Sequence, residues 1–208
     1  MRVDWVPYSA SGLVVGAAGL SVGALLMPQP GDPASPLGMG AGEDDRWLAI
    51  SVLYLLAAVG LAVGLPAVTS IFDRRGARWA LVGVGTLAVG ILGAAAYAVL
   101  MSVLRALVVG GVPLAGGVGG LAEDAWLAVL LHGWVSVFAV GEVLIAMALL
   151  QARRVSRWVP ALMLAHAGLT PLAPMMPVAL AAVTALTATM AFAGLGIAAN
   201  RRSLPPIL

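Results

Sequence analysis

Residues 126–150 read WLAVLLHGWVSVFAVGEVLIAMALL, an apolar run that carries one acid, Glu142. The run exceeds the ~20 residues that an α-helix needs to cross a hydrocarbon core of ~30 Å. A carboxyl group at that depth costs about 2.5–3.5 kcal/mol to insert, so a chain that keeps one has a partner, a proton or a use for it. This stretch therefore predicts a membrane-spanning helix and makes Glu142 its most informative residue.

Apolar sequence of this kind fills most of the chain. Of the 208 residues, 62% are hydrophobic and 10% are charged, and the mean hydropathy is +1.04. We expect an all-α, polytopic membrane helix bundle that forms one transmembrane domain over residues 1–208. The absence of cysteine excludes disulfides and thiolate metal sites. All 11 basic residues are arginine, which excludes a retinal Schiff base, and the net charge of +2 gives no reason to expect a nucleic-acid partner.

Six membrane-spanning helices are expected. They cover about residues 8–27, 47–72, 79–108, 126–150, 158–173 and 175–200. The last two are separated at Pro171, Pro174 and Pro177, because the apolar stretch from 158 to 200 is too long for one span. The fifth helix is then short, about 24 Å, and crosses only where the bilayer thins or a turn is buried in protein.

Arginine placement predicts the orientation. With six spans, the basic turns at 73–78 and 153–157 fall on one side, together with Arg2, Arg201 and Arg202. The positive-inside rule then places both termini in the cytoplasm. The Gly-rich segments 28–45 and 110–120 then form external loops. The external face carries six acids, namely Asp32, Glu43, Asp44, Asp45, Glu123 and Asp124.

Two segments of the chain match at a constant offset of 79 residues (Trp47 to Trp126, and Trp79 to Trp158). The shared pattern Arg-Arg-x-x-Arg-Trp occurs at 74–79 and 153–158. This favours a duplicated two-helix hairpin, spans two and three repeated as spans four and five, as in transporters with parallel repeats. The alternative is that topology alone imposes interfacial Trp and internal Arg.

Small residues form stripes at helical spacing. Gly12, Gly16, Gly19 and Gly23 lie on one face of the first span, and Gly60 and Gly64 on the second. Such stripes let helix backbones approach closely, either within the chain or across a homodimer. Pro66 interrupts the second span, which is tolerated where a neighbouring helix satisfies the freed backbone groups.

A polar site is expected on spans four and five. Glu142 and His166 each lie about 12 Å from the inner end of their helices, so in an antiparallel hairpin they can meet and form a hydrogen bond. The bond can be an ion pair or a neutral acid–imidazole pair. His132 and Ser136, further out on the helix of Glu142, and Tyr54 on the second span extend this site into a polar path. The positions of the first hairpin equivalent to His132, Glu142 and His166 are Leu53, Val63 and Leu87.

Each polar residue also has a plain structural interpretation. Glu142 and His166 can serve only to satisfy each other, and His132 can be an interfacial histidine. A haem held by His132 and His166 is a further interpretation, but a helical His pair alone is a weak signal. Zinc lacks a third ligand apart from Glu142.

The stretch from His132 to Pro160 resembles a class of six-helix membrane proteins from actinobacteria and other bacteria. The likeness rests on His132-Gly133, Gly141-Glu142 and the run from Arg153 through Arg157 to Pro160. It implies six spans and a bacterial cytoplasmic (inner) membrane, and it carries no activity or site residue over to this chain.

Three functions are considered, and the sequence favours the first, which is not enzymatic. It is a protein that binds or moves a small lipophilic or protonatable ligand near Glu142 and His166. The second is a membrane-embedded enzyme that acts on a lipid or isoprenoid, with Glu142 as proton donor. The third is a structural or assembly subunit that uses its glycine stripes against a membrane-protein partner or a second copy.

Overall fold

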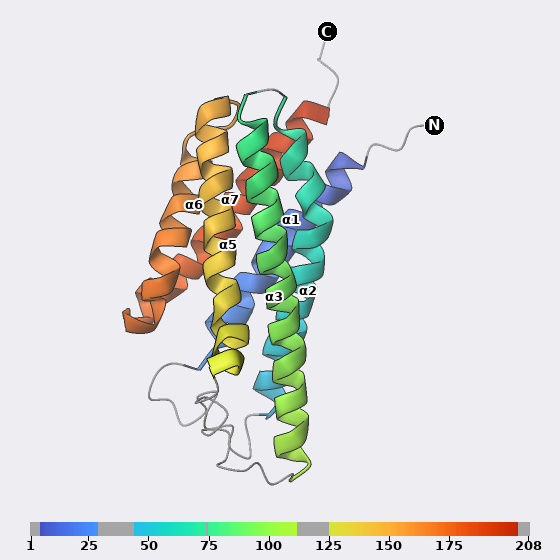
Figure 1. Cartoon of the computed structure of the whole chain (residues 1–208), viewed down its shortest axis with the longest axis vertical. Helices are drawn as coiled ribbons and strands as arrows, with labels where there is room; N and C mark the ends of the chain where they lie inside the picture. The colour runs from blue at the N-terminus through green and yellow to red at the C-terminus, as the bar shows by residue number, and fades with distance from the viewer. Residues whose placement is uncertain (1–4, 29–43, 74, 112–124, 204–208) are drawn as a thin grey trace.

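A computed structural model describes residues 5–28, 44–73, 75–111 and 125–203, and every element in these ranges is helical. The predicted all-helical bundle is thus confirmed, and the helix ends lie within a few residues of those expected. The two expected external loops, 28–45 and 110–120, lie almost entirely outside the described residues, and so do most of the acids assigned to the external face. Arg2 and Arg74, which were assigned to the internal face, also lie outside them. The elements are α1 (Val6–Leu26), α2 (Asp44–Ser70), α3 (Ala77–Val109), α5 (Ala125–Ala152), α6 (Trp158–Leu169), the 3-10 helix η2 (Thr170–Met175) and α7 (Val178–Ser203) (Figure 1).

Five described helices are long and apolar enough to cross a membrane, namely α1, α2, α3, α5 and α7. The expected fifth span is the shorter apolar segment Trp158–Ala173, in which α6 gives way to the 3-10 helix η2. Pro171 lies in the first turn of η2, where its missing N–H leaves no bond broken. The Pro177 carbonyl then accepts from the Leu180 and Ala181 amides as α7 begins, so the proline-rich segment is a tight reversal.

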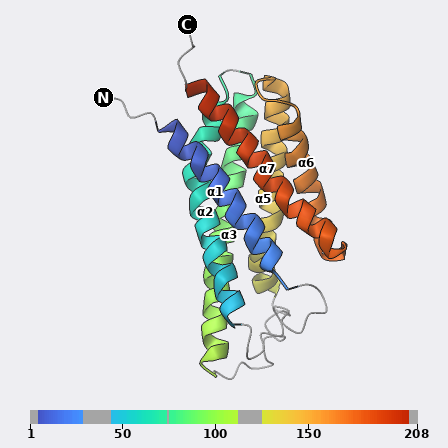
Figure 2. The ribbon, with the colours of Figure 1, turned by 180° about the vertical axis from the view of Figure 1, so that it is seen from behind.

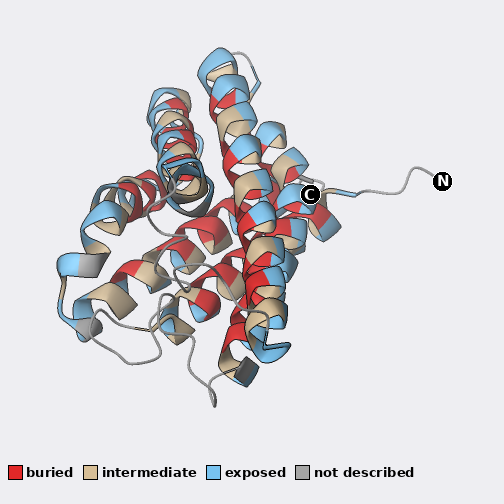
Figure 3. Cartoon of the chain, turned by 60° about the horizontal axis from the view of Figure 1, so that its bottom comes forward, coloured by how far each residue is buried: buried red, intermediate tan, exposed pale blue. Residues whose placement is uncertain are grey.

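The surface of the bundle is largely apolar. Large side chains such as Leu81 and Leu92 are each 70% exposed, and many valines and leucines on the other helices face outward with them. Buried positions lie on the faces that the helices turn toward one another (Figure 3). Contiguous apolar surface on this scale is unusual for a protein in water and normal for one in lipid.

The helices form two groups that cross. α3 lies against α2 and α5, and α6 lies between α5 and α7. α1 and α7 run antiparallel beside each other and cross diagonally over the more upright helices, in front of them in Figure 2. Because all these elements meet around the middle of the chain's longest helices, side chains from every one of them can reach a common interior.

α1 and α2 pack at unusually short range through the predicted glycine stripes. A Cβ added to Gly16 would lie 2.5 Å from the Leu61 amide nitrogen, and one added to Gly60 would lie 2.9 Å from Gly16 Cα. Gly12 and Gly64 meet the opposing helix equally closely. The stripes are therefore occupied within the chain, because no side chain fits between the two backbones.

Pro66 lies inside α2 without ending it. A proline lacks the N–H of its own turn and its ring disturbs the hydrogen bonds next to it. Ser9 of α1 reaches into this break: its Oγ donates to the Val63 carbonyl at 2.7 Å and accepts from the Ala67 amide at 3.0 Å. The neighbouring helix thus joins the two backbone groups that the regular helix would have paired.

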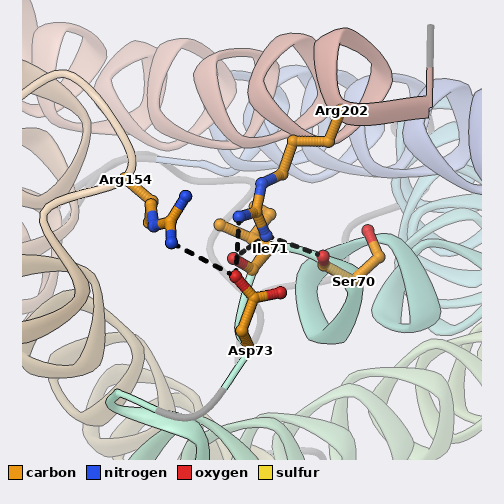
Figure 4. A network of polar contacts seen from close by, with 5 residues as sticks. All are labelled: Ser70, Ile71, Asp73, Arg154 and Arg202. Atoms are coloured by element: carbon orange, nitrogen blue, oxygen red, sulfur yellow. Dashed lines mark hydrogen bonds and ion pairs between the residues drawn. The ribbon is translucent and has the colours of Figure 1, made fainter. Parts of the chain in front are cut away.

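One end of the bundle is tied together by a polar network around Asp73 (Figure 4). Arg202, at the end of α7, places Nη2 3.1 Å from Asp73 Oδ2 and donates through Nη1 to the carbonyls of Ser70 and Ile71. Arg154, in the turn after α5, lies 3.4 Å from the same carboxylate oxygen. The α2–α3 turn, the α5–α6 turn and the end of α7 therefore meet at one end, as the arginine pattern requires.

The two hairpins matched by sequence differ in their surroundings. Trp79 and Trp158 are exposed to a similar extent, at 51% and 48%. Trp47, in contrast, is 1% exposed whereas its counterpart Trp126 is 79% exposed. The acidic residues matched just before Trp126 lie outside the described residues, and the duplication itself remains a prediction.

Candidate functional site

Glu142 and His166 form the hydrogen bond expected from their depths. The facing helices α5 and α6 bring His166 Nδ1 to 2.7 Å from Glu142 Oε2. The carboxyl group is completely buried and His166 is 8% exposed. Because an unpaired polar group costs several kcal/mol in an apolar interior, each residue explains how the other is tolerated.

The pair leaves one acceptor unused. Glu142 Oε1 is buried and has no hydrogen-bond partner among the described residues. A carboxyl group can accept several hydrogen bonds, and this one makes a single bond. Buried polar atoms without partners are rare in folded proteins; the described residues hold two, Glu142 Oε1 and Trp47 Nε1, and only Glu142 lines the cavity that adjoins the pair.

A cavity of about 230 Å³ lies beside the pair. It is small compared with the ~300–1,000 Å³ pockets of drug-sized ligands, but larger than a ~150 Å³ cavity that holds benzene. It therefore suits one ring or a short chain. Its lining residues come from every described helix: Leu20, Ser21, Ala24, Met27, Tyr54, Tyr97, His132, Trp134, Val135, Phe138, Ala139, Glu142, His166, Thr170, Ala185 and Ala188.

Three aromatic side chains form one wall of this cavity. The ring centroids of Tyr54 and Tyr97 are 5.4 Å apart, and each lies 5.9 Å from the Trp134 ring. Trp134 precedes Glu142 by two helical turns, about 12 Å along α5. The cavity thus has a polar end at Glu142 and His166 and an aromatic wall further out.

Two hydroxyl groups of the lining are already committed to protein partners. Ser21 Oγ donates to the Ala185 carbonyl and lies 2.8 Å from Thr189 Oγ1. Thr170 Oγ1 donates to the carbonyl of His166 at 2.7 Å. A ligand's polar group is therefore left with the Glu142–His166 pair as the ionisable partner at this end of the cavity.

The structure brings together four of the five site residues expected from the sequence. Glu142, His166 and Tyr54 line the cavity, and His132 joins them from an exposed position. Ser136 is exposed and is not among the lining residues, because its position on α5 turns it away from the interior. Where the sequence predicted a polar path, the structure has a cavity with one polar end and an aromatic wall.

Sequence reasoning did not include Tyr97, Trp134 or Phe138 in the site. Tyr97 is one of three tyrosines in the chain and lies within the apolar run expected as the third span, which could have marked it as a polar site residue. Phe138 and Trp134 precede Glu142 by four and eight residues, so all three lie on one face of α5. This spacing could have predicted that the two aromatic residues belong to the same site as Glu142.

Metal chemistry finds little support in the geometry. No group of three or more potential metal-ligating side chains occurs among residues 5–28, 44–73, 75–111 and 125–203. From the sequence we expect no cofactor, with a haem held by His132 and His166 only as a minor alternative. Both stay predictions, and the small cavity favours a smaller ligand.

Comparison with protein-family models, curated proteins and solved structures found no match to this chain. The resemblance to six-helix bacterial membrane proteins remains a prediction.

Proposed function

We propose that this chain is a multi-pass membrane protein that binds a small lipophilic ligand in the cavity beside Glu142 and His166. The observation that carries the proposal is the unused Glu142 Oε1 at the polar end of an otherwise apolar cavity. Apolar pockets with a few convergent polar groups are the usual form of small-molecule sites. The aromatic wall supplies the contact surface for the apolar body of the ligand.

The proposal extends to location. The apolar exterior and five long apolar helices support insertion in a bilayer. We assign the end that carries Asp73, Arg154 and Arg202 to the cytoplasm of a bacterial inner membrane, with both termini on that side.

Binding is favoured over the two other functions considered. The glycines of α1 are packed against α2 within the chain, so the stripes give no surface for an assembly partner or a second copy. An enzyme would need further groups besides the Glu142–His166 pair to act on the ligand. Of the other polar lining residues, Ser21 and Thr170 are bonded within the protein, and His132 joins the cavity from an exposed position.

The test is native mass spectrometry of the protein extracted gently from its own membrane. We expect the wild type to carry a small molecule and Ala139→Phe, which fills the cavity beside Glu142, to lose it. Ser136→Ala lies on the same helix outside the cavity and should keep the ligand. A bare wild-type protein, or a bound molecule that Ala139→Phe retains, would contradict the proposal.

A further inference from the structure

The cavity contains an acid and no permanent cation. The ionisable side chains that line it are Tyr54 from α2, Tyr97 from α3, His132 and Glu142 from α5, and His166 from α6. The described lining residues contributed by α1, η2 and α7 are not ionisable, and no arginine is among the lining. An anionic ligand would therefore meet a carboxyl group with no compensating positive charge, which leaves neutral and cationic ligands.

The hydrogen bond between His166 Nδ1 and Glu142 Oε2, 2.7 Å long, holds one shared proton. Two groups in a buried, low-dielectric site are stable together when their charges cancel. With Nε2 also protonated, the pair carries no net charge whether the shared proton resides on Nδ1 or on Oε2, because both forms hold the same number of protons. A cation that enters beside this pair would upset the balance unless one proton left.

The exposure of the two residues indicates how the exchange proceeds. Glu142 has no exposed surface, whereas the His166 side chain retains 10% of its own. His166 is thus the more accessible member of the pair, and both residues line the cavity. An ammonium group that replaces His166 as the partner of Glu142 finds two acceptor oxygens, since Oε1 is already unpaired and Oε2 becomes free.

We propose that the ligand is a lipophilic amine in its ammonium form, bound by the Glu142 carboxylate with release of one proton from the Glu142–His166 pair. This inference rests on the proposed binding function and adds the chemical class of the ligand. The N–H groups of the ammonium donate to the carboxylate, and the apolar body lies toward Tyr54, Tyr97 and Trp134. The cavity volume limits that body to about one ring or a short chain.

The test compares two probes of equal shape, 2-phenylethylammonium and 2-phenylethanol, by isothermal titration to the purified full-length protein at pH 6, 7 and 8. Release of one proton raises the apparent affinity for the amine about tenfold per pH unit, whereas the affinity for the alcohol stays constant. Titrations in buffers of different ionisation enthalpy should report one proton released per amine bound.

Two variants locate the effect. Glu142→Gln should weaken amine binding by tenfold or more and remove its dependence on pH. The double variant Glu142→Val/His166→Leu, which installs the residues of the first hairpin, should do the same and guards against misfolding, because an apolar replacement of a buried pair is often neutral for stability.

The outcomes separate the two proposals. Equal binding of both probes with no pH dependence overturns the amine inference and leaves the binding site standing. Alcohol binding without amine binding does the same. If neither probe binds the wild type more tightly than Ala139→Phe, the inference and the proposed site both fail.

Discussion

The two hairpins matched by sequence, α2–α3 and α5–α6, place opposite chemistry at equivalent positions. Glu142 is completely buried, whereas its counterpart Val63 is 55% exposed on the outer surface. His166 hydrogen bonds to Glu142, whereas its counterpart Leu87 is buried against the backbone of Gly141. Glu142 and Val63 therefore point in different directions, whereas His166 and Leu87 are both buried and differ only in what they contact. The comparison shows that the rotation of the helix decides whether an acid at this position can be enclosed.

The largest expected effect comes from breaking the polar pair on one side only. His166→Leu gives the second hairpin the residue of the first and leaves Glu142 buried without a partner. We expect a loss of about 3–5 kcal/mol in stability, measured as unfolding in detergent. The double variant Glu142→Val/His166→Leu should recover most of it. A single variant as stable as the double would show that the two residues are not coupled.

The reverse exchange should be costly for a different reason. Val63→Glu puts an acid in the first hairpin at the position of Glu142, but on the outward-facing surface and without a histidine nearby. In a bilayer this costs about 2.5–3.5 kcal/mol, which a membrane-insertion assay of α2 would detect. Val63→Leu is the control and should insert normally. Normal insertion of the Glu variant would argue against lipid at that face.

A smaller effect is expected at the backbone break of the first hairpin. Ser9→Ala removes both hydrogen bonds that join Val63 and Ala67 across Pro66, and should destabilise the protein by about 1–2 kcal/mol. Ser11→Ala is the matched control, because Ser11 Oγ bonds only within α1, to the Pro7 carbonyl.

A second substitution shows whether the effect of Ser9 comes from the break itself. Pro66→Ala restores the missing N–H, so Ser9→Ala in that background should cost less than it does in the wild type. An equal cost in both backgrounds would show that Ser9 acts through packing and not through the interrupted helix.

Much of the fold could be predicted from the sequence because the physical signals are one-dimensional. Apolar runs bounded by Trp and Arg give helix ends, and helix rise gives depth, which is why Glu142 and His166 could be paired in advance. When a helix is apolar on all its faces, its sequence does not predict which face turns toward the other helices. For that reason Trp47 and Trp126 look alike in sequence, yet one is buried and the other exposed.

The remainder of the site depends on which helices are neighbours. Tyr97 and Trp134 belong to the cavity only because α3 lies between α2 and α5. Ser9 completes α2 only because α1 lies beside it. Arg154 and Arg202 share Asp73 because the end of α7 reaches the turns of both hairpins. Each of these contacts joins residues that are distant in the chain, and a single sequence does not predict which distant residues meet.

The bond between Ser9 and the interrupted part of α2 also bears on biogenesis. The helix with the defect is synthesised after the helix that corrects it, so the partner is already available when residues 63–67 leave the ribosome. On the proposed insertion into a bilayer, the Val63 carbonyl and the Ala67 amide then need no later segment as a partner. The order of the helices along the chain therefore lets α1 supply the hydrogen bonds of Ser9 as soon as α2 has been synthesised.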